Sequence, residues 1–89
     1  MARPYNSPDV FRAIAHPVRR RMIDMLRNGS LTAAELAHPF NMAQPSASEH
    51  IRALRVAGIV VSRPRGVHNV YSLVSGSLRP VHAWLRRQR

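Results

Sequence analysis

Five short polar side chains begin a well-patterned amphipathic segment in the middle of this 89-residue chain. They are Gln44, Ser46, Ser48, Glu49 and His50. Glutamine can pair bidentately with adenine, serine can serve either base partner, and glutamate can accept a hydrogen bond from cytosine N4. Small side chains at a helix start also allow close approach to a surface and leave backbone N–H groups for phosphate. The chemistry that this row could perform is hydrogen bonding to DNA base edges.

A second polar set surrounds a Pro-Arg-Gly turn further along the chain. Arg63, Arg65 and His68 flank this turn, and Arg52 lies on the outer side of the amphipathic segment. Arginine suits phosphate contacts and narrow minor grooves. The other interpretation is an ordinary solvated hairpin turn, and we favour DNA contact.

The charge of the chain favours a polyanionic partner. Fourteen arginines and no lysine face four acids, which gives a net charge of +10. Six arginines and two aspartates fall in residues 1–30, two arginines and two glutamates in 31–60, and six arginines without an acid in 61–89. Positive charge therefore flanks a neutral middle. Near the start of the second helix, Arg19, Arg20 and Arg21 oppose the helix dipole, which suggests a nearby external anion; a solvated face is the alternative.

Composition excludes several other classes of function. With no cysteine, the chain has no disulfide framework, thiolate metal site or cysteine nucleophile. No carboxylate pair and no Ser-His-Asp arrangement suggests catalysis, so we expect neither an enzyme nor a cofactor. No apolar run is long enough for a membrane span, and the first ten residues lack a signal-peptide core, so we expect a cytoplasmic protein without a membrane partner.

Caps, breakers and periodicity predict a sequence of short elements. Ala47, Ile51 and Leu54 define the buried side of the amphipathic helix. The expected elements are a helix from Ser7-Pro8 to His16-Pro17, a second helix ending at Asn28-Gly29, a third capped by Thr32 and Glu35, a fourth from Ala43 to Gly58, strands over 59–63 and 69–74 around a turn at 64–66, and a last helix after Ser77. This order predicts a mainly α fold with a small β-hairpin, a winged helix-turn-helix, as a single domain over residues 1–89.

The first and last helices carry apolar sides that the core of such a fold does not need. These side chains would suit a twofold interface, although packing within their own chain is the alternative. The predicted interface residues are Val10, Phe11, Ile14, Leu78, Val81, Trp84 and Leu85. A homodimer would place two recognition helices about one DNA turn apart, roughly 34 Å or a multiple of it, on a near-palindromic site.

Four stretches together resemble successive segments of the ArsR-type family of bacterial winged-helix repressors. They are AHPVRRRMIDML, LTAAELA, QPSASEHIRALRVAGIV and GVHNVYSL, and the similarity covers roughly residues 8 to 75. The resemblance implies a homodimeric repressor that binds double-stranded DNA and releases it on binding an effector, here of unknown identity. It also implies that the row from Gln44 to His50 holds the recognition-helix contacts and that the protein is associated with the bacterial nucleoid when bound to DNA.

The chain departs from this family at two kinds of position. The family commonly has serine where Ala43 stands, so Ser46 and Glu49 are expected to form a substitute capping box, unless Glu49 reads a base instead. Metal-sensing members carry cysteines early in the third helix or Asp/His/Glu sets in the last helix. Thr32 and Ala34 occupy the former positions and His82 stands without an acid in the latter, so the chain resembles a subgroup without an assigned metal, and we predict no metal site.

Two functions of other classes remain as alternatives. A sequence-indifferent nucleic-acid packaging protein would suit the charge, but it would favour Lys or Arg where Ser46, Ser48 and Glu49 stand. A winged-helix module that binds another protein would use the arginines only to solvate its surface. Competition by unrelated DNA distinguishes a packaging protein from a sequence-specific regulator. The lack of any salt-dependent DNA binding would indicate the protein-interaction module.

Overall fold

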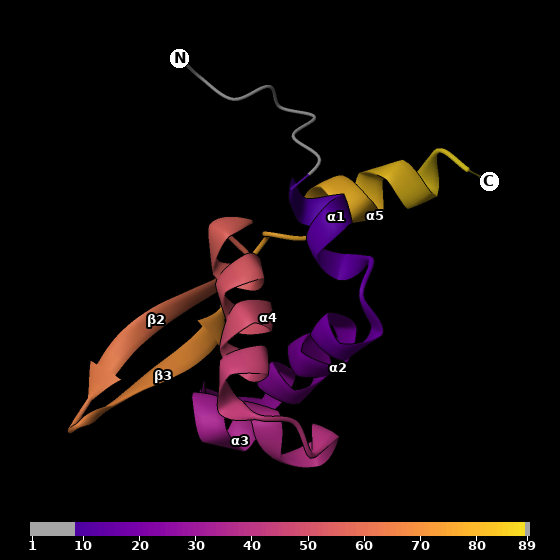
Figure 1. Cartoon of the computed structure of the whole chain (residues 1–89). Coiled ribbons are helices and arrows are strands. Elements are labelled where there is room, and N and C mark those ends of the chain that lie inside the picture. Colours follow the sequence, from indigo (N-terminus) through magenta and orange to yellow (C-terminus); the bar gives the residue numbers. More distant parts are fainter. Residues whose placement is uncertain (1–8, 89) are drawn as a thin grey trace.

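The computed structural model describes residues 9–88, so the predicted start of the first helix at Ser7-Pro8 lies outside the described residues. The described residues form five α-helices and a small antiparallel sheet, with the last helix beside the first rather than over the sheet (Figure 1). The helices are α1 (Asp9–Ile14), α2 (Pro17–Met25), α3 (Ala33–Ala37), α4 (Gln44–Val56) and α5 (Arg79–Arg86), with 3-10 turns at Leu26–Asn28 and His38–Phe40. The strands are β1 (Leu31–Thr32), β2 (Val60–Arg65) and β3 (His68–Leu73). The predicted helix order and winged helix-turn-helix class are confirmed.

The core lies between α2, α3, the inner side of α4 and the sheet. Met22, Leu36, Leu54 and Ile59 are its largest fully buried side chains, and none of the described residues buries a polar or charged side chain. The remaining buried apolar residues are Ala13, Ile23, Leu26, Ala37, Ala47, Ile51, Val60 and Val70. The core therefore fixes α4 by its inner side and leaves the other side to solvent.

The start of the short third helix is set by local hydrogen bonds. The Glu35 backbone N–H donates to Thr32 Oγ1 at 3.1 Å, and the Thr32 N–H donates to Glu35 Oε1 at 2.8 Å. These bonds form the predicted capping box, and they lower the pKa of the Glu35 carboxyl. Asn41, with φ of 50°, then turns the chain from the 3-10 turn toward α4.

The end of α4 is a Schellman motif. Gly58 has a φ of 80°, its N–H donates to the Arg55 carbonyl at 2.9 Å, and the Ile59 N–H donates to the Leu54 carbonyl at 2.9 Å. Leu54 and Ile59 are both buried, so the apolar contact that accompanies this motif is present. Gly58 thus ends the helix as predicted and directs the chain into β2.

The sheet has three strands rather than the predicted two. Its order is β1-β3-β2, with Leu31 opposite Tyr71 and Thr32 opposite Val70. The Ser30 and Ser72 hydroxyls lie 2.6 Å apart beside this pair. Two residues are too few to show an alternating pattern, which is why the sequence did not indicate β1.

The predicted turn at 64–66 was placed too early. Pro64 and Arg65 belong to β2 and pair with Asn69 and His68. Proline is tolerated there because β2 is an edge strand, where a missing N–H is not needed by a neighbour. The turn itself is Gly66 and Val67, and the Gly66 φ of 62° fits the first central position of a type II′ hairpin turn.

Candidate nucleic-acid interface

The two sides of α4 differ completely in their environment. Ala47, Ile51 and Leu54 are at most 3% exposed, whereas the side chains of Gln44, Ser46, Ser48, Glu49 and Arg52 are all exposed. The inner side of α4 packs in the core, so these five exposed side chains take no part in the packing of the described residues. They form a continuous outward surface on the first two and a half turns of a rigid helix.

The predicted substitute capping box of Ser46 and Glu49 is wrong. α4 begins at Gln44, its N-cap is Ala43, and no side chain caps it. Ser46 already lies inside the helix, because its backbone N–H donates to the Ala43 carbonyl at 3.0 Å. Proline at the second helical position needs no N–H partner, so the helix can start before Ser46. Glu49 is therefore an exposed carboxylate on the outer surface of α4.

His50 differs from the rest of the row because its side chain is half-buried and tied to α2. Arg19 Nε donates to His50 Nδ1 at 3.1 Å, and the His16 ring centroid lies 4.6 Å from that of His50. Burial lowers the pKa of His50, and the nearby charges of His16 and Arg19 lower it further. The neutral ring accepts at Nδ1, which leaves Nε2 as the nitrogen that could donate outward.

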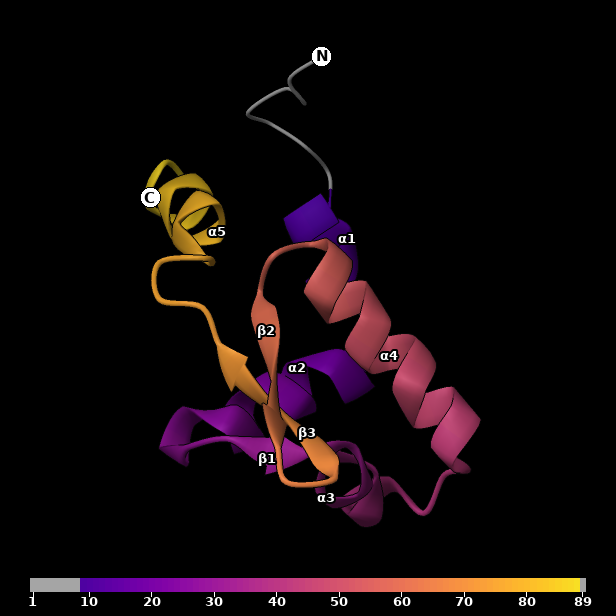
Figure 2. The ribbon, with the colours of Figure 1, turned by 90° about the vertical axis from the view of Figure 1, so that its left-hand side faces the viewer.

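The β2–β3 hairpin, the wing, presents the second polar set. Arg63, Arg65 and His68 are exposed, and Arg65 lies directly opposite His68 in the pairing register. Val67 at the tip is 94% exposed. In Figure 1 this hairpin projects on one side of α4, away from α1 and α2. Figure 2 shows its tip at the same end of the molecule as the start of α4. The structure thus places the wing and the polar row on one region of the surface.

The predicted site residues did not include Arg12 or Arg55, which the structure places beside α4 and on it, and Arg19 also lies beside α4. Arg55 is exposed on α4 itself, Arg12 comes from the last turn of α1, and Arg19 comes from the first turn of α2. The external anion predicted beside Arg19, Arg20 and Arg21 stays a prediction, which rests on three cations that oppose the helix dipole at a helix start. Arg12 gave no local signal, because its position beside α4 arises only from tertiary packing.

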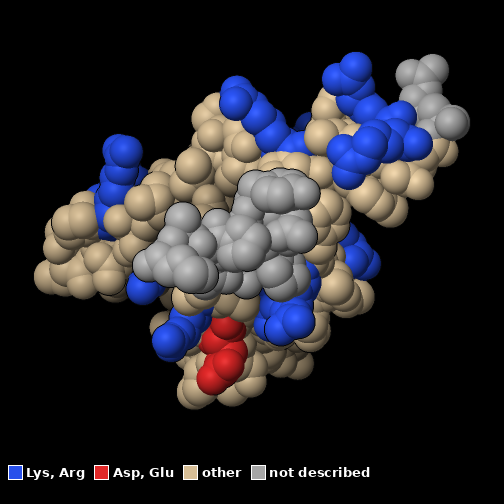
Figure 3. Space-filling view, turned by 90° about the horizontal axis from the view of Figure 1, so that it is seen from above, with Lys and Arg blue, Asp and Glu red and all other residues tan. Residues whose placement is uncertain are grey.

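The predicted interface residues of the first and last helices separate into two groups. Val10, Ile14 and Leu78 pack against the core of their own chain. Phe11, Trp84 and Leu85 are 36%, 45% and 58% exposed, and the Phe11 and Trp84 rings form an edge-to-face pair with centroids 6.2 Å apart. Val81 is half-buried. Figure 3 shows this end of the molecule from above, with arginine side chains spread over the face and acidic side chains in one place.

The described residues contain no group of three or more His, Cys, Asp or Glu side chains that could hold a metal ion. Among the helices over residues 9–86, none has the length and apolarity needed to cross a membrane.

Comparison with known proteins identifies the family. Residues 14–63 match the model of a helix-turn-helix domain. The chain is 35% identical to the transcriptional repressor SdpR of Bacillus subtilis over 77 residues, which cover 86% of each protein. A crystal structure of an ArsR family transcriptional regulator superposes with a TM-score of 0.84 at 34% identity, covering 99% of this chain and 92% of that one. The chain belongs to the ArsR family.

ArsR membership agrees with the fold and excludes an enzyme. The matched proteins are helix-turn-helix transcriptional regulators, several of them repressors. A homodimeric winged helix-turn-helix DNA-binding domain from Mycobacterium bovis superposes with a TM-score of 0.73 at 22% identity, over 97% of this chain and 87% of that one. At that identity the likeness concerns the fold, and its dimeric state belongs to that protein.

Proposed function

We propose that this ArsR protein is a homodimeric transcriptional repressor that recognises a near-palindromic DNA operator. One observation carries the proposal: the outer surface of α4 is a row of exposed, short polar side chains on a helix whose inner side is already complete. A helix-turn-helix protein inserts the N-terminal residues of its second helix into the major groove. α3 and α4 are that pair, and α4 starts with Gln44.

Base recognition is assigned to the exposed part of the row. Gln44 suits adenine, Ser46 and Ser48 can serve donors or acceptors, and Glu49 can accept from cytosine. Two roles were predicted for Glu49, a helix cap and a base reader. Because no side chain caps α4, we assign Glu49 to base reading. His50 contributes through Nε2, since Nδ1 accepts from Arg19.

Backbone contacts are assigned to the arginines beside the row. Arg52 extends from α4, and Arg63, Arg65 and His68 extend from the wing. These side chains would contact phosphates or the neighbouring minor groove, which fixes the register of the helix without carrying sequence information directly. Such contacts make affinity depend steeply on salt.

Dimerisation is assigned to the α1 and α5 end. The exposed Phe11, Trp84 and Leu85 form an apolar surface on a protein of high net charge, and large aromatic side chains are typical centres of interfaces. Val10, Ile14, Leu78 and Val81 would support this surface from beneath. The homodimeric Mycobacterium bovis domain of the same fold is consistent with this arrangement.

The signal to which the repressor responds is assigned to an effector that is not a metal ion held by cysteine thiolates. The chain has no cysteine, and Thr32 is used in the cap of α3. The expected partners are thus double-stranded DNA, a second copy of the chain and an unidentified effector. Because its target would be chromosomal DNA, the protein is expected to act on the nucleoid in the bacterial cytoplasm.

The experiment that tests this function is selection of bound sequences from a random DNA pool at physiological salt. The enriched sequence is then titrated against a scrambled duplex of the same length. Enrichment of a near-palindrome with half-sites about one turn apart supports a dimeric operator-binding repressor. Equal binding to every duplex would indicate packaging instead, and no salt-dependent binding at all would indicate a protein-interaction module.

A further inference from the structure

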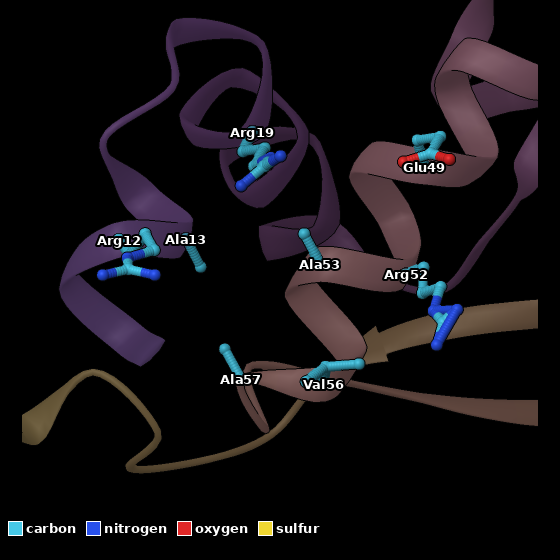
Figure 4. Close-up of a pocket in the computed structure, with 8 residues that line it drawn as sticks. All are labelled: Arg12, Ala13, Arg19, Glu49, Arg52, Ala53, Val56 and Ala57. Atoms are coloured by element: carbon cyan, nitrogen blue, oxygen red, sulfur yellow. The ribbon is translucent and has the colours of Figure 1, made fainter. Parts of the chain in front are cut away.

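A hollow of about 280 Å³ lies between α4 and the α1–α2 pair. Figure 4 shows Arg12 and Arg19 on one side of it and Glu49 and Arg52, from α4, on the other. Its floor consists of small apolar side chains that include Ala13. The guanidinium groups of Arg12 and Arg19 therefore border one open site, with Arg52 at its edge and Glu49 as the single carboxylate among its lining residues. This charge balance favours an anionic occupant.

α4 has a second hollow on its opposite flank. That hollow, of about 500 Å³, lies toward the sheet and is bordered by Ser48, Arg55 and Tyr71. Arg52 and Val56 line both hollows, so they form the outward ridge of α4 between them. Figure 1 shows the same arrangement at the level of elements, with the wing on one side of α4 and α1 and α2 on the other.

The Arg19 side chain is held in place at the hollow between α4 and the α1–α2 pair. Its Nε donates to His50 Nδ1 at 3.1 Å, which ties the guanidinium to α4. The two terminal NH2 groups of a guanidinium are not used by such a bond, and a group ordered in advance loses less entropy when it binds. The neighbouring Arg20 donates instead to the Ile14 carbonyl at 2.7 Å, which holds together the junction between α1 and α2.

We propose that Arg12 and Arg19, with Arg52 at the edge of the hollow, form a phosphate site for the operator backbone, on the side of α4 opposite the wing. The inference rests on the proposed insertion of α4 into DNA. A major groove is about 12 Å wide and is bordered by two phosphodiester strands, so a helix in the groove has one strand on each side. The wing arginines serve one strand, and Arg12 and Arg19 serve the other, with Arg52 on the ridge of α4 between them.

Arg12→Ala is the variant that tests this site, because Arg12 makes no described contact that holds the fold, whereas Arg19 is bonded to His50. Arg27→Ala is the matched control. It removes the same charge from an exposed residue on the 3-10 turn after α2. The affinity of each protein for the selected operator and for a scrambled duplex is measured between about 50 and 300 mM salt.

Loss of one phosphate contact is expected to reduce the slope of log affinity against log salt by about 0.9 and to weaken binding to both duplexes equally. Arg27→Ala should retain the wild-type slope, and Arg12→Lys should restore most of the slope lost in Arg12→Ala. An unchanged slope in Arg12→Ala, or a loss restricted to the operator, would overturn the phosphate site while the wild-type protein still binds its operator. Failure of the wild-type protein to select any DNA would instead overturn the proposed function.

Discussion

Helices α4 and α5 are both amphipathic, but only α4 completes its apolar side within its own chain. Ala47, Ile51 and Leu54 on α4 are at most 3% exposed. On α5 no residue is buried, and Trp84 and Leu85 keep 45% and 58% of their surface exposed. The difference lies in what surrounds each helix: α4 crosses the core between α3, α2 and the sheet, whereas α5 extends past α1 at one end of the molecule (Figure 1).

The comparison shows what an amphipathic pattern does and does not determine. It identifies which side of a helix is apolar; in α4 that side is buried as predicted, whereas in α5 the covering predicted for it stays a prediction. It does not say whether the covering surface comes from the same chain or from another. The buried side of α4 thus supports folding, and the exposed apolar side of α5 is available for a second copy.

The largest effect should come from truncating the α4 core. Leu54→Ala removes a side chain that is 1% exposed, and it should lower the free energy of unfolding by about 2–5 kcal/mol through lost burial and an unfilled cavity. Val56→Ala on the same helix is the control, because Val56 is 63% exposed, and it should change stability by less than about 0.5 kcal/mol. Urea unfolding followed by circular dichroism measures both. Equal losses would show that α4 is not anchored by its inner side.

Leu85→Asp should produce the next largest effect, on assembly rather than on folding. A carboxylate in the centre of an apolar interface is costly, so dimer affinity should fall about a hundredfold, or about 2.8 kcal/mol. The control is Ala83→Asp, which introduces the same charge on the opposite side of α5. Sedimentation equilibrium gives the dimer affinity, and circular dichroism verifies that the fold is retained. If both variants assembled like the wild type, the α5 surface would not be the interface.

Most of the fold could be predicted because its boundaries depend on local chemistry. Thr32 and Glu35 cap α3 within one turn of chain, and Gly58 ends α4 through its own backbone conformation. β1 could not be predicted, because its two residues become a strand only by pairing with Tyr71 and Val70. The position of the hairpin turn was missed because Pro64 is tolerated only on an edge strand, and the strand order is a tertiary property.

The candidate site also has one part that depends on local sequence and another that depends on tertiary packing. The outward row from Gln44 to Glu49 could be read from helical periodicity, and the structure places all four predicted polar side chains on the exposed surface. The hydrogen bond between Arg19 and His50 could not be predicted from the sequence, because 31 positions separate these residues. Local patterns therefore located the solvent-exposed polar side of α4, whereas its flanking cations depend on how α1 and α2 pack.

Gln44→Ala should affect operator recognition without affecting the core. Loss of a bidentate base contact should weaken operator binding about tenfold, or about 1.4 kcal/mol, with little change for scrambled DNA and no change in the salt slope. Ser48→Ala should act in the same direction with a smaller effect. Arg65→Ala should lower both affinity and slope, because its contact is to phosphate. Titration of the selected operator and the scrambled duplex over a range of salt separates these results, and equal losses on both duplexes would argue against base reading by Gln44.

The smallest expected effect is a change in the pH dependence of stability. It is tested by comparing His50 on α4 with His82 on α5. The pKa of His50 is lowered from its ordinary value of 6.5, first by burial and then by the charges of His16 and Arg19, with Glu49 acting in the opposite direction. The unfolded chain therefore binds the proton more readily, so this contribution to stability is fully present above pH 6.5 and is lost as the pH falls below it. Glu35 titrates at lower pH, because its pKa is lowered from 4.5, so the two effects occur in separate ranges.

His50→Gln should flatten the loss of stability between pH 7.5 and 5.5, because glutamine can still accept the hydrogen bond from Arg19 and does not titrate. His82→Gln on α5 should follow the wild-type pH dependence, since His82 is exposed. Urea midpoints of the three proteins at the two pH values make the comparison. If the His50 and His82 variants lost stability in parallel with the wild type, the contact between α4 and α2 would not respond to protonation of His50. A flat profile for His50→Gln alone would show that a residue on the flank of the exposed polar row of α4 is energetically part of the fold.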